Sequence, residues 1–308
     1  MVLQGIGLII ARTLAVNGAK AVYILGPNQS ELDEAVAATS CPPSHSSDAA
    51  KLNGEIAPLR PILCDITSTI CNEAAAAQIK AEQGYLNLLV ANAGVGGPNE
   101  PAGKLQAIAG NKTSPGFITP SEYASVMSQV PTGDFNRVFE VNATGTFYTI
   151  LAFLPLLEAG NAVKLTAPVT IQSHKSHILL TSSIAAIIRS TMDFSPPYAL
   201  SKAAVVHLMK SLATYSAQNQ WDIRVNAILP GLMKSAMTVG IPFMAGLDGK
   251  EVWEDGGVPK EVSPMGRLAG EEDVAGAVLW LCSKAGGFIS GVNVVVDGGR
   301  TAIVPASY

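Results

Sequence analysis

Apolar runs and amphipathic stretches alternate along the whole chain. Six short runs rich in Val, Ile and Leu are typical of strands, and several are continuous rather than alternating, as in strands buried on both faces. The predicted strands are Val22–Leu25, Leu59–Cys64, Leu86–Ala91, Ser176–Thr181, Ile223–Ile228 and Val292–Val296. Between them, apolar residues recur at helical spacing and predict helices over Leu8–Asn17, Ser30–Ala38, Cys71–Gln83, Phe135–Glu158, Tyr198–Ala217 and Glu271–Lys284.

This alternation predicts an α/β protein of the Rossmann type, with a doubly wound parallel sheet covered by helices on both faces. Two stretches depart from the pattern. Residues 41–54 are rich in Pro and Ser and are expected to form a surface loop, and residues 96–117 are rich in Gly, Pro and Asn and are expected to form an insertion. Neither stretch has the length or hydrophobicity of a second domain, so residues 1–308 are predicted to form a single domain.

The composition favours a large buried core, because 48% of the 308 residues are hydrophobic and only 14% are charged. A net charge of −4 offers no electrostatic footprint for nucleic acid. The four cysteines form no CxxC pair and are expected to be reduced and structural. The histidines show no metal-binding pattern: His174 and His177 are three residues apart, but we expect a solvated loop there because they precede a predicted strand.

Nothing in the first residues indicates a secretory signal, because the positively charged start is missing. Polar residues interrupt the first apolar stretch, which argues against a membrane span. The apolar run at 147–157 is short and contains Pro155. We therefore expect a cytoplasmic protein with no membrane partner.

The most informative local pattern is Tyr198-Ala-Leu-Ser-Lys202. A spacing of four at the start of a helix places the phenol and the ammonium on one face. A nearby positive charge favours the phenolate and lowers a tyrosine pKa from about 10, which suits an acid/base that works near neutral pH. Taken alone, the pair fits a helix surface equally well.

Small or polar residues follow several predicted strands. Thr181 is followed by Ser182-Ser183, Ala91 by Asn92-Ala93-Gly94, and Leu229 by Pro230-Gly231. Because parallel strands end at the same edge of a sheet, these residues are expected at the edge where open α/β sheets bind ligands. In addition, Gly5-Ile6-Gly7 leads directly into a helix, whose N-terminal amides can hold a pyrophosphate.

With these motifs, the sequence resembles the short-chain dehydrogenase/reductase family from Gly5 to about Asp297. The resemblance implies that Tyr198 is the general acid/base and that Ser183 orients the substrate carbonyl. It also implies that Lys202 holds the nicotinamide ribose and lowers the Tyr198 pKa. Asn142, in ValAsnAlaThrGly, matches the residue that kinks a helix and completes a proton relay.

The same resemblance implies a cofactor site. Besides Tyr198 and Lys202, the residues implied to contact the dinucleotide are Gly5, Ile6, Gly7, Asp65, Ile66, Asn92, Ala93, Gly94, Pro230, Gly231 and Ser235. Two alternatives stay open: Ser182 competes with Ser183 for the catalytic role, and Asp65 is also placed to cap the following helix.

The implied function is an NAD(P)-dependent oxidoreductase that transfers a hydride between nicotinamide and a carbonyl or secondary alcohol. A Met-rich, apolar loop at about 232–265 and the insertion at 96–117 suggest a medium-sized, largely apolar substrate. The chain as a whole is similar to reductases of fungal secondary metabolism, and the resemblance implies a homodimer or homotetramer. The alternative is a truncated or non-catalytic homologue that acts as a binding or oligomerisation partner.

The choice of cofactor depends on the end of the second family strand. Many NAD-binding proteins place an acidic residue there to bind the ribose hydroxyls, and many NADP-binding proteins place a basic one nearby. This chain has Leu25-Gly26-Pro27-Asn28, without an acid to repel a 2′-phosphate. The sequence thus favours NADP over NAD.

One departure from the family concerns its first strand. The family has a hydrophobic strand before the glycine turn, whereas only Met1 to Gln4 precede Gly5 here. That strand would be central, and its loss would leave unpaired backbone groups on two neighbouring strands. The hypothesis from the sequence is that the first strand is truncated and that the natural protein begins roughly 8 to 15 residues upstream, since a domain stable by only about 5–15 kcal/mol could hardly absorb that loss.

Overall fold

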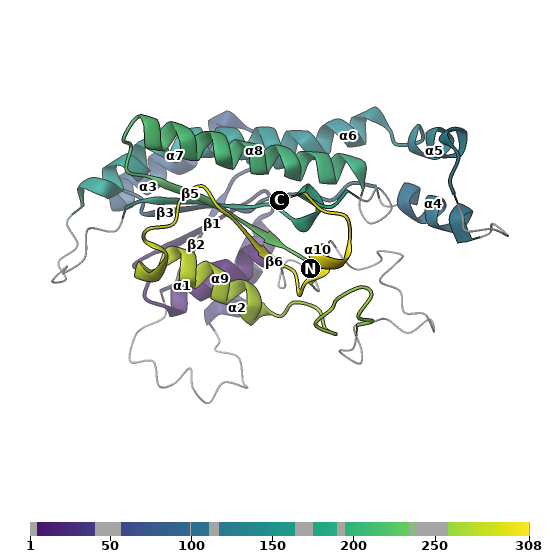
Figure 1. Cartoon of the computed structure of the whole chain (residues 1–308). Helices are drawn as coiled ribbons and strands as arrows, with labels where there is room; N and C mark the ends of the chain where they lie inside the picture. Colours follow the sequence, from purple (N-terminus) through teal and green to yellow (C-terminus); the bar gives the residue numbers. More distant parts are fainter. Residues whose placement is uncertain are drawn as a thin grey trace.

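The computed structural model describes residues 5–40, 57–98, 100–110, 117–163, 175–189, 195–233, 237 and 258–307. Its strands form one layer between two layers of helices, and every strand pairing is parallel (Figure 1). The strands are β1 (Val22–Gly26), β2 (Leu59–Leu63), β3 (Leu88–Ala91), β4 (His177–Thr181), β5 (Arg224–Pro230) and β6 (Asn293–Val296). The predicted α/β class with a parallel, doubly wound sheet is confirmed.

Helices cover both faces of the strand layer, with α3, α7 and α8 on one face and α1, α2 and α9 on the other (Figure 1). The longer helices are α1 (Ile6–Val16), α2 (Gln29–Ser40), α3 (Thr69–Gln83), α4 (Glu100–Gly110), α7 (Thr146–Ala162), α8 (Pro196–Gln218) and α9 (Glu271–Cys282). Three shorter ones are α5 (Pro120–Met127), α6 (Thr132–Phe139) and α10 (Arg300–Ile303).

The strongest apolar runs of the sequence become the most enclosed strands. Every residue of β4 and β5 is buried, since both faces of these strands are covered by helices. Their side chains enter two different clusters: Leu180 and Leu229 pack beneath α7 and α8, whereas Leu179 and Ile228 pack against α1 and α9. This sandwich fixes the carboxyl ends of β4 and β5 in space, and the candidate site lies at these ends.

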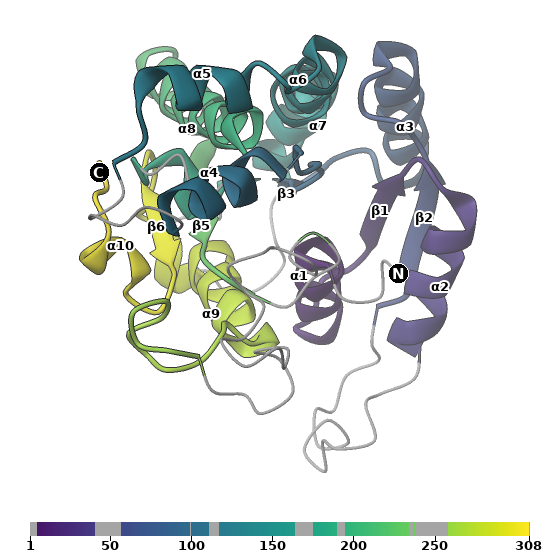
Figure 2. The same cartoon turned by 90° about the vertical axis from the view of Figure 1, so that its right-hand side faces the viewer.

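The strand layer is divided into two hydrogen-bonded units, β1-β2 and β3-β4-β5-β6. Among the described residues β1 and β3 do not pair with each other, although they lie on either side of α1 in Figure 2. Helix α1 packs on both units. Leu8 and Ala11 contact the cluster of Val22 and Leu59 from the first unit, while Ile9 and Ile10 pack with Leu179 and Ile228 from the second.

Two features of the helical layer differ from the sequence predictions. The insertion predicted at 96–117 contains a helix, α4, and a further helix, α5, follows it. The single helix predicted over Phe135–Glu158 is interrupted by a π-helical segment, Glu140–Gly145, between α6 and α7. An inserted residue of this kind cannot be read from apolar spacing, because it arises from contacts with the rest of the fold.

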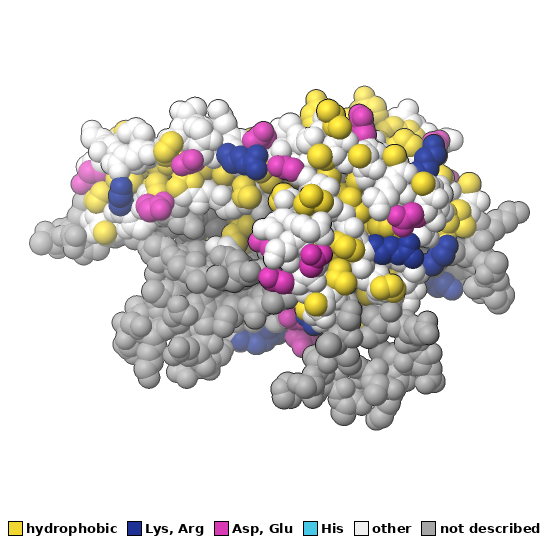
Figure 3. All heavy atoms as spheres, turned by 180° about the vertical axis from the view of Figure 1, so that it is seen from behind, with side chains coloured by type: hydrophobic (Ala, Val, Ile, Leu, Met, Phe, Trp, Pro, Cys, Tyr) yellow, Lys and Arg dark blue, Asp and Glu magenta, His cyan; other side chains and the backbone are white. Residues whose placement is uncertain are grey.

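Charged residues of both signs are distributed over the surface, as Figure 3 shows for the face opposite to that of Figure 1. Within the described ranges, no helix has both the length and the apolar character that a membrane span requires. The described cysteines Cys64, Cys71 and Cys282 are free thiols, and the described residues contain no cluster of three metal-ligating side chains.

The prediction that His177 belongs to a solvated loop is wrong; its partner in that prediction, His174, lies outside the described residues. His177 is the first residue of β4, is 1% exposed, and accepts a hydrogen bond from Asn226 Nδ2 at 3.1 Å. The Cys282 thiol lies 3.8 Å from its other ring nitrogen. Burial, aided by the nearby Arg224, lowers the pKa of His177 to about 3. The imidazole is therefore neutral in the folded protein at neutral pH.

This buried imidazole predicts a specific loss of stability in acid. The unfolded chain takes up a proton at His177 below a pH of about 6.5, whereas the folded chain does so only near pH 3, so the stabilisation present above pH 6.5 is lost as the pH falls. Compared with His177→Gln, the wild type should lose up to about 1.4 kcal/mol more of its unfolding free energy per pH unit in that window. Urea unfolding at several pH values between 7 and 4 measures the difference.

His207→Gln is the matched control, because His207 is exposed on α8. Its unfolding free energy should follow the wild-type pH dependence. Equal pH slopes for the wild type and His177→Gln would contradict the role given to His177.

Candidate active site

Helix α8 carries a buried lysine to the carboxyl end of β4. Lys202 is only 4% exposed, and its Nζ donates a hydrogen bond to the Thr181 carbonyl at 3.0 Å. The same nitrogen lies 5.9 Å from the centre of the Tyr198 ring. Burial lowers the pKa of Lys202 to about 8, because the charged form loses hydration that one carbonyl only partly replaces.

Tyr198 lies one turn before Lys202 and is partly buried. Burial raises the pKa of Tyr198 above its ordinary value, and a hydrogen bond with the Ser183 side chain opposes part of that rise. The sequence led us to expect a lowered pKa. The direction differs because removal of the phenol from water outweighs the stabilisation of its anion. In this structure Tyr198 is a neutral phenol near pH 7.

The geometry separates the two candidate serines. Ser183 follows β4 with extended backbone, and its hydroxyl oxygen reaches both Tyr198 and the amide of Ala185, from which it accepts a hydrogen bond at 3.1 Å. Ser182 is buried and donates to the Lys202 carbonyl at 2.8 Å, so it ties α8 to β4. Ser183, and not Ser182, lies beside the phenol.

Asn142 is fully buried in the π-helical segment, and its side-chain amide clamps the loop that follows β3. Its Oδ1 accepts from the Val95 amide at 2.7 Å, and its Nδ2 donates to the Val95 carbonyl at 3.0 Å. The second hydrogen of Nδ2 goes to the hydroxyl of Ser201 at 2.9 Å. The π segment thus joins the β3 loop to α8.

Gly94 lies where this loop, Asn142 and Lys202 meet. A Cβ at position 94 would lie 3.1 Å from Asn142 Oδ1 and 3.1 Å from Lys202 Nζ. These contacts are tighter than a side chain tolerates without movement of its neighbours. The glycine is required for the close approach and not for an unusual backbone angle.

The glycine turn lies beside the AsnAlaGly motif. A Cβ at position 7 would lie 2.7 Å from Nδ2 of Asn92, so the start of α1 and the end of β3 are in contact. Gly5 is the N-cap of α1 and has no side chain to accept the first-turn amide hydrogens. Asn92 Oδ1 is buried and has no hydrogen-bond partner among the described residues. A helix N-terminus, a glycine cradle and an unpaired amide oxygen fit the phosphates and ribose of a dinucleotide.

The other cofactor residues expected from the sequence occupy different parts of the same edge. Asp65 accepts hydrogen bonds from the amide and hydroxyl of Thr67 at 2.9 and 2.8 Å, and these bonds lower its pKa. The N-cap of α3 is Ser68, so Asp65 does not take the capping role left open for it. Ile66 packs against Gly145 of the π segment, because a Cβ at Gly145 would lie 3.1 Å from its side chain.

The remaining residues expected at the cofactor are Ala93, the Pro230-Gly231 turn and Ser235. Ala93 is exposed. The Pro230-Gly231 turn packs against Asp297, since a Cβ at Gly231 would lie 2.7 Å from the Asp297 Cα. Ser235 and most of the predicted substrate loop, 234–236 and 238–257, lie outside the described residues.

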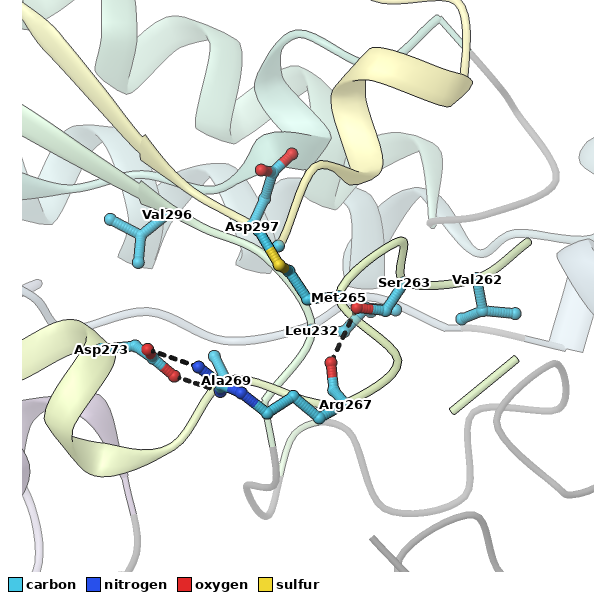
Figure 4. Close-up of a pocket in the computed structure, with 10 residues that line it drawn as sticks. Leu232, Val262, Ser263, Met265, Arg267, Ala269, Asp273, Val296 and Asp297 are labelled. Atoms are coloured by element: carbon cyan, nitrogen blue, oxygen red, sulfur yellow. Dashed lines mark hydrogen bonds and ion pairs between the residues drawn. The ribbon is translucent and has the colours of Figure 1, made fainter. Parts of the chain in front are cut away.

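A small cavity of about 60 Å³ lies next to the Gly231–Asp297 contact (Figure 4). Its walls come from the end of β5, the segment 262–269 and the turn after β6. Arg267 and Asp273 form an ion pair on one side at 2.6 Å, which lowers the Asp273 pKa to about 2. Asp297 caps the next turn by accepting from the amide and hydroxyl of Thr301, each at 2.7 Å. The acidic groups are therefore committed to structural bonds.

Sequence reasoning did not single out Ser201 or Val95. Ser201 lies between the two residues of the Tyr–Lys pair, one helical turn after Tyr198, and this spacing is the signal that could have identified it. Val95 acts through its backbone alone, and no side-chain pattern identifies it.

Known proteins resemble this chain over nearly its whole length. The family model described as "Enoyl-(Acyl carrier protein) reductase" matches residues 107–301. The chain is 38% identical over 314 residues to the short-chain dehydrogenase/reductase PhomF' of Diaporthe leptostromiformis, covering 99% of this chain and 90% of that protein.

Two solved structures are similar over nearly the whole chain. The 7α-hydroxysteroid dehydrogenase complexed with NADH and 7-oxo glycochenodeoxycholic acid has a TM-score of 0.65 and 26% identity, covering 96% of this chain and 90% of its own. The Pseudomonas aeruginosa RhlG/NADP active-site complex shares the fold, with a TM-score of 0.67 and 22% identity over 97% of this chain and 93% of its own. The chain belongs to the short-chain dehydrogenase/reductase family, and it is an oxidoreductase that acts on CH–OH groups.

The Gly94→Ala substitution tests whether Asn142 and Lys202 pack closely against the β3 loop at position 94. The added methyl group must displace Asn142 Oδ1 or Lys202 Nζ, so we expect a loss of about 1–3 kcal/mol of unfolding free energy, as for overpacked sites. Chemical denaturation measures it.

Gly276→Ala in the exposed middle of α9 is the control, since a Cβ there meets nothing within 4 Å. It should stabilise the protein by about 0.5–1 kcal/mol, because alanine loses less backbone entropy than glycine in a helix. A Gly94→Ala protein as stable as the wild type would refute the tight packing at this point.

Proposed function

We propose that this protein is an NAD(P)-dependent oxidoreductase that interconverts a carbonyl and a secondary alcohol, with Tyr198 as general acid/base. The observation that carries the proposal is the joint placement of a buried Lys202, a Tyr198 phenol and the Ser183 hydroxyl at one strand edge. Nicotinamide, when bound, supplies or accepts the hydride. The chain's own residues bind the reactants, orient them and move the proton.

The roles of the three side chains follow from their chemistry. Ser183 and Tyr198 are hydrogen-bonded to each other and can hold the same carbonyl oxygen from two sides. In the direction of reduction, the neutral phenol donates its proton to that oxygen. Its raised pKa keeps the proton available across the neutral range. In the direction of oxidation the phenol must lose its proton first, and the Lys202 charge then stabilises the phenolate.

Lys202 has a second role at the cofactor. Its Nζ uses one hydrogen for the Thr181 carbonyl and lies against Gly94, which leaves donors for ribose hydroxyls at this edge of the sheet. Asn142 holds Val95 and so keeps the Gly94 backbone close to Lys202. Gly5, Ile6 and Gly7 would hold the pyrophosphate at the N-terminus of α1.

We favour NADP over NAD as the cofactor. Asn28, at the end of β1, uses its side-chain oxygen to accept from the amides of Ser30 and Glu31 at 3.0 and 3.4 Å, which caps α2. The position therefore presents no carboxylate that would repel a 2′-phosphate.

The substrate we propose is a medium-sized, largely apolar carbonyl or alcohol. An apolar recess of about 280 Å³ lies beside the start of α8, and its walls include Pro196 and Pro197, directly before Tyr198. The aromatic and thioether side chains of Phe135, Tyr123 and Met127 line the other side. Met237, from the segment expected to cover the substrate, packs against Gly96.

We further propose a homodimer or homotetramer. Apolar side chains remain partly exposed on helices α7 and α8, which we propose form the subunit contacts. They are Phe147 (39%), Tyr148 (44%) and Leu151 (40%) on α7, and Leu200 (53%) and Tyr215 (61%) on α8.

Tyr198→Phe tests the proton transfer directly. Loss of the hydroxyl should lower kcat by about 10²–10⁴-fold, the usual contribution of a general acid/base, and leave the dissociation constant of NADPH within about twofold. Carbonyl reduction is followed by NADPH absorbance with a panel of apolar ketones. A Tyr198→Phe enzyme that keeps full kcat would overturn the assignment.

Titration of NADPH and NADH by fluorescence tests the cofactor site. NADPH should bind more tightly, and its apparent dissociation constant should rise by up to about tenfold per pH unit above pH 8 as Lys202 loses its proton. In Lys202→Met this rise should be absent and affinity lower at pH 7. Tighter binding of NADH would reverse the NADP preference, and no binding of either would favour the non-catalytic alternative.

A further inference from the structure

We infer that Ser201 is a positioning residue that anchors the Asn142 amide to α8 and thereby sets the distance between the β3 loop and Lys202. The inference rests on the proposed function only for its kinetic consequence. Its structural content, the clamp on Val95, is independent of any reaction.

Ser201 is completely buried in α8, three residues after Tyr198 and directly before Lys202. Its hydroxyl donates to the Tyr198 carbonyl at 2.8 Å. A carbonyl oxygen can only accept, so the direction of this bond is fixed. This bond uses the only hydrogen of the Ser201 hydroxyl, so toward Asn142 the oxygen can act only as a hydrogen-bond acceptor.

That constraint favours the same orientation of the Asn142 amide that Val95 requires, since Oδ1 must face the Val95 N–H and Nδ2 the Val95 carbonyl. Nδ2 can donate to Ser201, as it does at 2.9 Å, whereas Oδ1 in the same place would face another acceptor. With Nδ2 toward α8, Oδ1 is turned to the Val95 amide at 2.7 Å. The other hydrogen of Nδ2 reaches the Val95 carbonyl at 3.0 Å.

The Asn142 amide is thereby saturated, with one acceptor and two donor bonds among buried groups. Its side chain acts by holding Val95. Because Gly94 packs against both Asn142 Oδ1 and Lys202 Nζ, the position of Val95 determines how closely the β3 loop approaches the lysine. Removal of the Ser201 hydroxyl leaves a buried Nδ2 hydrogen unpaired and takes away one of the three bonds that hold the amide in place.

The experiment compares Ser201→Ala with Ser216→Ala. Ser216 is a matched control: it is buried on the same helix, 4% exposed, and its hydroxyl donates to the Ile223 carbonyl at 2.5 Å, away from the site. Hydrogen–deuterium exchange of the peptide spanning 92–98 reports the Val95 amide without any need for turnover. Exchange should be about tenfold faster in Ser201→Ala and unchanged in Ser216→Ala, since only the former releases the clamp.

Kinetics supply the second measurement. Ser201→Ala should lower kcat by about 10- to 100-fold through misplacement of the reacting groups, while Ser216→Ala stays within twofold of the wild type. Asn142→Ala combined with Ser201→Ala should be no slower than Asn142→Ala alone, because both substitutions release the same clamp. If Ser201→Ala does not fold, Ser201→Cys keeps the volume with a much weaker hydrogen-bonding group and is measured in its place.

Unchanged exchange at 92–98, or kcat losses that multiply in the double variant, would overturn the inference. If the wild type proves to have no oxidoreductase activity, the proposed function fails, and the exchange measurement still decides the role of Ser201.

Discussion

The site is organised around one charged group that has been removed from water. The Lys202 ammonium is almost fully buried, yet the Thr181 carbonyl is the one protein acceptor that it reaches at hydrogen-bonding distance among the described residues. Loss of hydration without full replacement is costly, and the lowered pKa of Lys202 measures that cost. Such an arrangement persists where the same group has a task, since a purely structural position is served better by an apolar side chain.

The backbone around this ammonium allows two neighbouring segments to lie close to it. Gly94 admits the β3 loop, and the π segment brings Asn142 inward from the helical layer. The Gly145 carbonyl, at the end of the π segment, accepts from the Thr149 hydroxyl at 2.8 Å. A π-helical turn of this kind is found mostly where function requires it, and here it places a side chain that a regular helix would direct elsewhere.

The sequence predicted the strands and most of their flanking helices well, because these elements depend on the spacing of apolar residues. All six strands appear within a few residues of their predicted ends, and so do the helices flanking them, apart from the interrupted helix predicted over Phe135–Glu158. The Tyr198–Lys202 pair and the strand-end motifs also come together, because parallel strands share one carboxyl edge. Helix α5 was missed although Thr119, Pro120 and Glu122 form a capping box with proline in the first turn, a signal that was present and not used.

Other features could not be obtained from local patterns. The Arg224 charge and the Asn226 hydrogen bond at His177 come from the adjacent strand, which a single strand does not reveal. The Tyr198 pKa was predicted in the wrong direction because sequence shows the neighbouring charge but not the burial that outweighs it. Ser201 escaped notice for a similar reason: its partner Asn142 is 59 residues away.

Helix α1 packs on both hydrogen-bonded units of the strand layer, and its first turn lies beside Asn92 at the end of β3. A molecule bound at that first turn therefore restrains the β1-β2 unit and the β3-β4-β5-β6 unit together, because α1 contacts both. Binding at the glycine turn and the stability of the contact between the two strand units are then thermodynamically linked. The two units should therefore unfold most cooperatively when a ligand occupies the glycine turn.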